Sequence, residues 1–326
     1  MAPLPPVKNV LRNLPTSPAA MVPAARFAFR LRPRSAGFPF VPPTWPATVA
    51  REREADTLGA GYDTAWARRY GVRLARAVVV DNIERPLLHL VARPTVDGAD
   101  RIAAVQGPVV FAANHASHLD TPLVLTSLPD RFRHRTVVAA GADYFFDTRL
   151  KAHLSAFLIG AVPIDRHKVS RTSAEQTSRL LEEGWNLLIF PEGGRTPDGW
   201  GHAHRGGAAY LGTKTGRPVV PVYLQGTRKV LKRGAAVPTP SKTRLLFGAP
   251  LQPADGESSR SFAARIEAAI EVLADEARHG FWDARRRAAA GITPSLRGPE
   301  AISWRRSWAL AEGRRRPQPP GSWPQL

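Results

Sequence analysis

Residues 108–120 read PVVFAANHASHLD, an apolar run that passes directly into a short polar motif. The apolar part, Pro108 to Ala113, predicts a strand. A helix is predicted from Leu119 to Ser127, with Ser117 as its cap and Pro122 in its first turn. The polar motif therefore lies in a strand-to-helix turn, and such turns are where open α/β sheets bind their ligands.

Strands and helices alternate along the rest of the chain. Further strands are predicted at Leu87 to Val91, Thr136 to Ala140, Val162 to Ile164, Asn186 to Phe190, Val219 to Leu224 and Thr243 to Phe247. Helices are predicted at Thr64 to Val80, Leu150 to Leu158, Ser173 to Glu183, Gly206 to Thr215 and Ser261 to Arg278. This alternation predicts an α/β fold with a mostly parallel central sheet flanked by helices.

The two ends of the chain differ in composition from its middle. Eleven of the 31 prolines fall in the first fifty residues, which contain no acidic residue, and proline interrupts helical periodicity. We therefore expect a flexible Pro/Arg-rich arm over residues 1–60 and one folded domain over residues 61–280. A second flexible, basic arm, containing glycine, proline and tryptophan, is expected over residues 281–326. A chain of 326 residues is long enough to bury one substantial core with such arms.

The chain is strongly basic, with 46 Lys and Arg against 27 Asp and Glu and a net charge of +19. This balance predicts attraction to a polyanion, either an anionic membrane surface or a nucleic acid. No helix-turn-helix, RNP-like or zinc signature points to nucleic acid. No apolar run approaches the ~20 residues of a spanning helix. We therefore expect a cytoplasmic protein that lies peripherally on the inner face of the cell membrane.

The polar motif pairs His115 with Asp120 at a spacing of five residues. On one straight helix this spacing would place the two side chains ~140–150° apart, so they could not cooperate there. They can meet only if His115 lies in the turn and Asp120 in the first turn of the helix. The pair then supplies a general base and the carboxylate that orients it. The competing interpretation is that Ser117 and Asp120 form a capping pair and that His115 is an ordinary loop residue.

A second motif, Phe190 to Thr196, reads FPEGGRT and follows another predicted strand. Gly193 and Gly194 allow backbone N–H groups to approach a ligand closely, and the guanidinium of Arg195 can form paired contacts with a phosphate. By itself a Pro-Glu-Gly-Gly segment is also typical of an ordinary loop.

Together the two motifs resemble the signatures of the PlsC-type glycerolipid acyltransferases, Asn-His-x4-Asp and Phe-Pro-Glu-Gly-Thr-Arg-Ser. Two further stretches, Gly160 to Arg166 and Val219 to Gly226, follow in the order of that family. The chain departs from the family pattern at Gly194, where the family usually has threonine. It also has His204 where the phenylalanine of a Phe-Lys-x-Gly segment would align, ahead of Arg205 and Gly207.

The resemblance implies a 1-acylglycerol-3-phosphate O-acyltransferase-like enzyme of phospholipid biosynthesis. It would move a fatty acyl group from acyl-CoA or acyl carrier protein to the free hydroxyl of lysophosphatidic acid or a related lysophospholipid, without a metal or other cofactor. The resemblance assigns catalysis to His115 and Asp120. Binding of the acceptor phosphate falls to Arg166, Glu192, Gly193 and Arg195, and supporting roles fall to Asn114, Ser117, Gly194 and Pro221.

Two other classes of protein remain open at this point. A metal-dependent hydrolase could use His115, His118 and Asp120, with His202 and His204 as further nitrogen ligands. The chain contains no cysteine, which excludes a thiolate zinc site. A basic nucleic-acid-binding protein would account for the charge. A serine hydrolase is disfavoured, because no Gly-x-Ser-x-Gly elbow surrounds Ser117.

Overall fold

The computed structural model describes residues 58–165, 171–195, 199–232, 234–235 and 237–298. Nearly all of the predicted arm 1–60 therefore lies outside the described residues, as does the second predicted arm from residue 299 onward. The part of that second arm that the structure describes includes a helix, α12 (Phe281–Ala289), which packs against α11 (Ser259–His279). The domain limits stay a prediction.

The described residues form one seven-stranded sheet with the strand order β1-β7-β6-β2-β5-β3-β4. The strands are β1 (Pro94–Asp97), β2 (Val110–Ala113), β3 (Thr136–Gly141), β4 (Ala161–Ile164), β5 (Asn186–Ile189), β6 (Val219–Gln225) and β7 (Thr243–Phe247). Every neighbouring pair is parallel except β6 and β7, which are antiparallel. The expected mostly parallel α/β sheet is confirmed.

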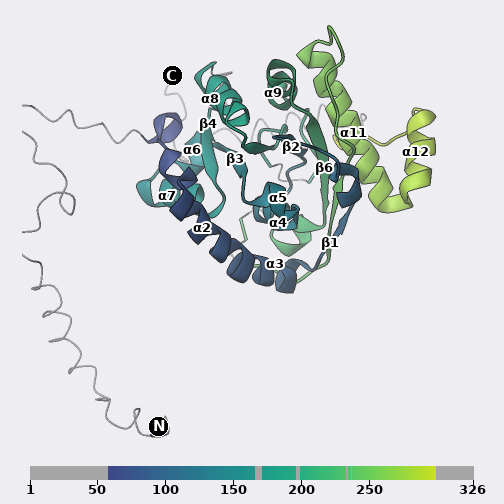
Figure 1. Cartoon of the computed structure of the whole chain (residues 1–326). Coiled ribbons are helices and arrows are strands. Elements are labelled where there is room, and N and C mark those ends of the chain that lie inside the picture. Colours follow the sequence, from purple (N-terminus) through teal and green to yellow (C-terminus); the bar gives the residue numbers. More distant parts are fainter. Residues whose placement is uncertain (1–57, 166–170, 196–198, 233, 236, 299–326) are drawn as a thin grey trace, which may run out of the picture. The chain divides into compact units, whose positions relative to one another are not determined.

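Helices cover both faces of this sheet (Figure 1). The longer ones, besides α11 and α12, are α2 (Tyr70–Val79), α3 (Arg85–Ala92), α4 (Asp120–Ser127), α7 (Arg149–Leu158), α8 (Arg171–Glu182) and α9 (Gly207–Thr215). Single turns form α5 (Asp130–Arg133), α6 (Ala142–Phe145), α10 (Thr227–Val230), η4 (Gly59–Gly61), η5 (Ala65–Arg68) and η7 (Ala99–Ile102), and a π-helical turn, η6 (Val80–Glu84), joins α2 to α3.

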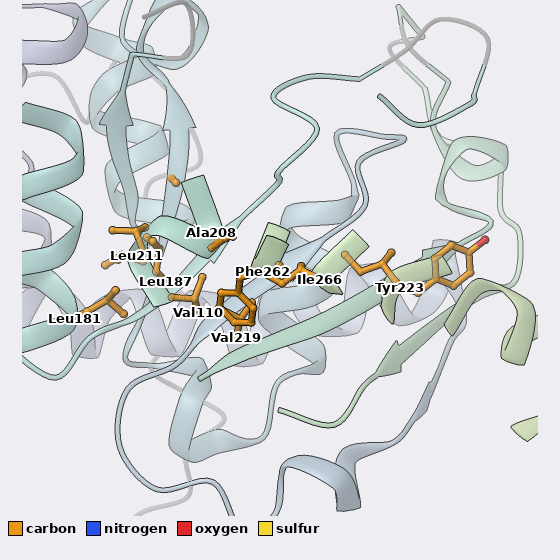
Figure 2. Packing of buried hydrophobic residues seen from close by; sticks show 14 of the residues in the cluster. Val110, Leu181, Leu187, Ala208, Leu211, Val219, Tyr223, Phe262 and Ile266 are labelled. Atoms are coloured by element: carbon orange, nitrogen blue, oxygen red, sulfur yellow. The ribbon is translucent and has the colours of Figure 1, made fainter. Parts of the chain in front are cut away.

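The core explains why the central strands are apolar throughout. Alternate side chains of β2 point to opposite faces of the sheet: Val110 packs with α8, α9 and α11, whereas Phe111 packs with residues of α4 and α5. Figure 2 shows the first of these clusters, in which Val110, Leu187 and Val219 from three strands meet Phe262 of α11. A strand buried on both faces needs an unbroken apolar run, as parallel strands generally do.

The strand predicted at Leu87 to Val91 is wrong, because these residues belong to helix α3. Pro86 sits in the first turn of that helix, where its missing N–H costs nothing. Leu88 and Ala92, four residues apart, are buried, while Leu87 and Leu90 are exposed. The true neighbouring strand is β1, a short edge strand that pairs with β7 and that the sequence reading missed.

Candidate active site

The site lies where β2 and β5 end. These two strands are adjacent and parallel, so their carboxyl ends meet at the same edge of the sheet. The turn from His115 to Leu119 follows β2, and the loop from Phe190 to Arg195 follows β5. Sheet topology therefore brings together the two motifs that are far apart in the sequence.

His115 and Asp120 are in direct contact. Nδ1 of His115 lies 2.9 Å from Oδ2 of Asp120, and the carboxylate is fully buried. The same oxygen accepts hydrogen bonds from the backbone N–H groups of Ala116, at 2.6 Å, and Ser117, at 2.7 Å. Asp120 begins helix α4, whose N-terminal dipole favours a negative charge at this position.

The hydrogen bonds around Asp120 define which nitrogen of His115 can act as a base. Oδ2 already accepts two backbone N–H groups, so Nδ1 must also donate to it and therefore carries the proton. Nε2 is then the unprotonated nitrogen, available to a substrate proton. The imidazole stacks on Phe190, with ring centroids 4.1 Å apart, and this contact fixes its plane. The capping contact of Ser117 with Asp120 is present as well, so it coexists with the His–Asp pair.

Ser117 and Asn114 are structural in this arrangement. The hydroxyl of the buried Ser117 donates to the carbonyl of Leu231 and accepts from the N–H of Leu119. The side chain of Asn114 exchanges two hydrogen bonds with the backbone of Leu224, at 3.0 and 2.7 Å, and so ties the end of β2 to β6. Both side chains hold the turn in place beneath His115.

Glu192 joins the two motifs. Its Oε1 accepts the N–H of His115 at 2.9 Å, and its Oε2 accepts the N–H of His202 at 3.1 Å. The side chain is buried, and burial raises the pKa of its carboxyl to about 7. The assignment of Glu192 to the acceptor phosphate stays a prediction, but its described contacts are with backbone amides that shape the site.

Gly193 lets the second motif turn sharply. Its φ of +69° is in the left-handed region, and a Cβ there would lie 2.7 Å from Nε of Arg205. A methyl group at Gly194 would meet nothing within 4 Å. Arg195 is half-buried, and Arg205 lies against the loop through its bond to Pro191 at 2.8 Å.

Arg205 is a candidate site residue that the sequence reading did not single out. Its N–H donates to the carbonyl of Pro191, and its side chain lies against Gly193, so a second cation flanks the predicted phosphate loop. Its place ahead of Gly207, where a Phe-Lys-x-Gly segment has its lysine, was the signal that could have found it.

Comparison with known proteins agrees with this geometry. Residues 93–225, which contain both motifs, match the family model described as Acyltransferase. This matched region of the chain is therefore similar to the acyltransferases. The match begins one residue before β1 and ends at the last residue of β6, so it covers most of the sheet but not the helices α2, α3, α11 and α12.

Several curated relatives align with part of this chain. The chloroplastic 1-acyl-sn-glycerol-3-phosphate acyltransferase BAT2 of Brassica napus is 28% identical over 149 residues, which are 43% of this chain and 39% of the relative. A 1-acyl-sn-glycerol-3-phosphate acyltransferase of Chlamydomonas reinhardtii is 33% identical, covering 43% and 41% of the two chains. The 1-acyl-sn-glycerol-3-phosphate acyltransferase alpha of Mus musculus is 29% identical over 40% of this chain and 45% of the relative. The chain thus spans about two fifths of the length of these relatives.

A solved structure has the same fold. The crystal structure of the 1-acyl-sn-glycerophosphate acyltransferase PlsC from Thermotoga maritima superposes with a TM-score of 0.51 at 22% identity. The superposition covers 66% of this chain and 88% of that one. The superposed part of this chain therefore has the fold of that structure.

Arg166 and Pro221, which the family resemblance also assigned to the site, lie outside the two motifs. Arg166 lies outside the described residues, which stop at Asp165 directly after β4. Pro221 lies buried inside β6, where its carbonyl accepts the N–H of Gly248 at 2.8 Å and its ring would contact any Cβ at that glycine. Pro221 therefore shapes the sheet near β7.

The residues weighed as metal ligands have other contacts. The ring of His118 stacks on Tyr144, whose hydroxyl lies 3.3 Å from Nε2 of that histidine. His204 is largely buried, and burial lowers its pKa. Within the described ranges, no three His, Asp or Glu side chains form a group that could hold a metal ion.

The contrast between the two glycines of the second motif predicts unequal effects on stability. We expect Gly193→Ala to lower the free energy of unfolding by roughly 1–3 kcal/mol, because alanine is strained at positive φ and its methyl overlaps Arg205. Gly194→Ala is the matched control and should change it by less than ~0.5 kcal/mol. Urea unfolding measures the free energy of unfolding of both variants. Equal losses of stability in the two would contradict the positive-φ turn assigned to Gly193.

Proposed function

We propose that this acyltransferase moves a fatty acyl group from a thioester donor to the free hydroxyl of lysophosphatidic acid or a related lysophospholipid, in phospholipid biosynthesis. The observation that carries the proposal is the His115–Asp120 contact, which leaves Nε2 of His115 unprotonated beside the glycine–arginine loop. The names of the relatives support a phosphorylated glycerolipid as the acceptor. The donor is acyl-CoA or acyl carrier protein.

The chemistry follows from the orientation of the imidazole. Nε2 of His115 takes the proton of the acceptor hydroxyl as that oxygen attacks the thioester carbonyl, and the carboxylate of Asp120 stabilises the imidazolium. Collapse of the tetrahedral intermediate forms the ester and breaks the C–S bond, and the leaving thiolate recovers the proton from Nε2. The buried hydroxyl of Ser117 donates to Leu231, so no acyl-enzyme forms there.

Acceptor binding is assigned to the second motif. Backbone N–H groups at Gly193 and Gly194 and the guanidinium of Arg195 would hold the phosphate, and Arg166 would join them. The bond from His115 N–H to Glu192 supports this assignment, because it keeps the base and the loop at a constant separation. Charged oxygens of the phosphate are then matched by cations and by backbone donors.

An acyl-transfer screen tests the function. Purified full-length protein is incubated with a panel of acyl-CoAs and acyl carrier proteins against a panel of lysolipids, and products are read by mass spectrometry. We expect diacylated phospholipid from lysophosphatidic acid, with no loss of rate in EDTA. Failure to acylate any lysolipid would overturn the proposal, and a hydrolytic activity abolished by chelation and restored by metal would favour the metal-dependent alternative.

We also propose that the enzyme meets its acceptor on an anionic membrane surface. No helix in the described part of the chain is long and apolar enough to cross a bilayer. Helices α2, η6 and α3 nevertheless run continuously from Tyr70 to Ala92 and follow one another along one side of the domain (Figure 1). Such a helix could lie in the plane of the membrane interface.

This helix carries an outward apolar stripe. Its large apolar side chains, between 56% and 77% exposed, are Tyr70, Leu74, Val78, Ile83, Leu87 and Leu90. They recur every three or four residues, and the single spacing of five coincides with the π-helical turn η6, which keeps the stripe on one face. Helix α7, which packs against α2, adds the exposed Leu150 and Leu154.

The charges around the stripe favour anionic lipid as its occupant. Arg85 of this helix is exposed, as are Arg69 and Arg93, which flank the helix at its two ends. The acidic Asp81 is paired with Arg133. Each basic residue near an anionic bilayer contributes about 1 kcal/mol of attraction. A location on the cytoplasmic face of the cell membrane stays a prediction.

Membrane binding has a direct test. The double variant Leu74→Glu/Leu87→Glu should weaken sedimentation with phosphatidylglycerol vesicles about 10-fold or more, because it removes apolar burial and adds like charge. Val237→Glu, at a more exposed apolar residue outside the stripe, is the control and should bind as wild type. Unchanged vesicle binding by the double variant would contradict the proposal. So would a wild-type protein that is a dimer in solution and becomes a monomer in the double variant, because the stripe would then bind a second copy.

A further inference from the structure

The C-terminal segment of the described chain lies next to the active site. Residues Thr293–Gly298, which we term the strap, follow α12 and return across α11. They lie beyond the region that matches the acyltransferase family, which ends at residue 225. No motif of the site includes them, so any role they have must come from their contacts.

The strap is attached to α11 by polar groups. The guanidinium of Arg297 makes two bonds of 2.6 Å to the carboxylate of Glu267. One turn further along α11, Glu271 accepts the hydroxyl of Ser295 at 2.8 Å and the N–H of Leu296 at 3.1 Å. A pocket of about 230 Å³ lies beside these contacts, and the side chain of Leu296 packs against the core cluster beneath the strap.

The anchor under the strap is rigid. Between the two glutamates that hold it, Ile270 of α11 is fully buried, and Ile266 and Leu273 lie in the same core cluster. This helix packs directly on β6, the strand adjacent to β2. A group fixed to Glu267 and Glu271 is therefore fixed relative to the strand from which the catalytic turn leaves.

The strap in turn holds the segment that completes the site. The carbonyl of Leu296 accepts the N–H of Gly201 at 2.8 Å, and Gly298 lies against the ring of Trp200. The next amide along, that of His202, donates to Glu192. Residues 199–205 belong to no helix or strand, so these contacts replace the support that regular structure would give.

Glu192 transmits this support to the catalytic turn. Its two carboxylate oxygens are shared between His202 N–H and His115 N–H, so the position of one segment sets the position of the other. A buried carboxylate that accepts from two backbone groups cannot move without leaving a donor unsatisfied. The hydrogen bonds therefore run without a gap from α11 through the strap, Gly201–His202 and Glu192 to His115.

We propose that the strap is a positioning element for catalysis, and that Arg297, through Glu267, holds the His115 turn in its reactive geometry. The expected effect on kcat rests on the proposed acyl transfer. The expected effect on the position of the His115 turn does not. Loss of the Arg297–Glu267 pair leaves the strap held at Glu271 alone, which loosens Gly201–His202 and Glu192, while the core of α11 and the His115–Asp120 pair remain. The loss should therefore fall on kcat and spare both KM values.

The experiment compares Arg297→Ala with Arg297→Lys and with Arg286→Ala. Arg286, on α12, forms an exposed pair with Asp283 and serves as the matched control. We expect Arg297→Ala to lower kcat about 10-fold with both KM values within twofold, because misplacement of a catalytic group costs rate. Lysine keeps the pair with Glu267 and should restore most of kcat, and Arg286→Ala should behave as wild type.

Hydrogen exchange read by mass spectrometry supplies a result that does not depend on activity. In Arg297→Ala we expect about 10-fold faster exchange in the peptides that contain Gly201–His202 and His115, with the core strands unchanged. If wild-type protein acylates no lysolipid, this readout still tests the strap. Unchanged exchange at His115 would overturn the inference, as would a uniform increase with a lowered Tm, which is the signature of a merely structural role.

A double variant tests whether the effect passes through Glu192. Glutamine at this position presents an N–H₂ group to one of the two backbone donors, so Glu192→Gln breaks one of the two links. Once that link is broken, Arg297→Ala should cost less than twofold more in kcat, because coupled residues are not additive. Fully additive losses would overturn the proposed route from the strap to His115.

Discussion

Replacing His115 with alanine is expected to lower kcat by about 10²- to 10⁴-fold, the range for removal of a general base. The acceptor hydroxyl would lose the group that takes its proton, and the thiolate would lose the group that returns it. Asp120 would keep its bonds to Ala116 and Ser117, so the turn should stay folded. Circular dichroism and urea unfolding, together with steady-state rates at saturating substrate, measure the two effects separately.

His118→Ala is the matched control for this prediction. His118 lies three residues further along the same turn, is partly buried and stacks on Tyr144. We expect it to keep most of the activity. Asp120→Asn should lose activity in the same range as His115→Ala, because the amide cannot stabilise an imidazolium. Near wild-type turnover by a folded His115→Ala protein would remove His115 from the mechanism.

Replacing Arg195 with alanine is expected to raise the KM for lysophosphatidic acid about 10- to 200-fold. A charge-assisted bond between arginine and phosphate contributes ~1.5–3 kcal/mol, and its loss falls on the substrate that carries the phosphate. Arg166→Ala, outside the described residues, should act in the same direction. Arg195→Lys should recover only part of the loss, because lysine keeps the charge but lacks the planar pair of donors.

The comparison that decides this second prediction is between the two substrates. KM for the lysolipid and KM for the acyl donor are measured in each variant, with Arg286→Ala as a control for loss of one surface charge. We expect the acceptor value to rise alone. A selective rise for the donor would transfer Arg195 to the acyl-CoA or carrier-protein site, and full recovery in Arg195→Lys would mean that the role needs only a point charge.

Much of the fold could be predicted because strands buried on both faces are apolar throughout. The ends of β2, β5 and β6 could be predicted to within two residues, since each strand is mainly apolar and is followed by polar residues. The same reasoning failed at Leu87 to Val91, where a short apolar run also fits an amphipathic helix. Helix α3 buries Leu88 but exposes Leu87 and Leu90, which no local pattern could reveal.

The candidate site could likewise be predicted only in part from the sequence. A spacing of five residues excludes a shared helix face, so the turn that joins His115 to Asp120 could be predicted from the sequence alone. Two glycines and an arginine after a strand likewise predicted a phosphate loop. The position of Glu192 could not be predicted, because its partners are backbone N–H groups, which every residue except proline carries and which leave no sequence signal.

The sequence by itself therefore determined the family, the parallel sheet and the residues of the two motifs, because these depend on side-chain type at short range. Tertiary structure alone decided that β7 runs antiparallel to β6, that Glu192 joins the catalytic turn to His202, and that the strap reaches Gly201. Each of these depends on hydrogen bonds between segments far apart in the chain. Such bonds form only where packing of the core has already brought the segments together.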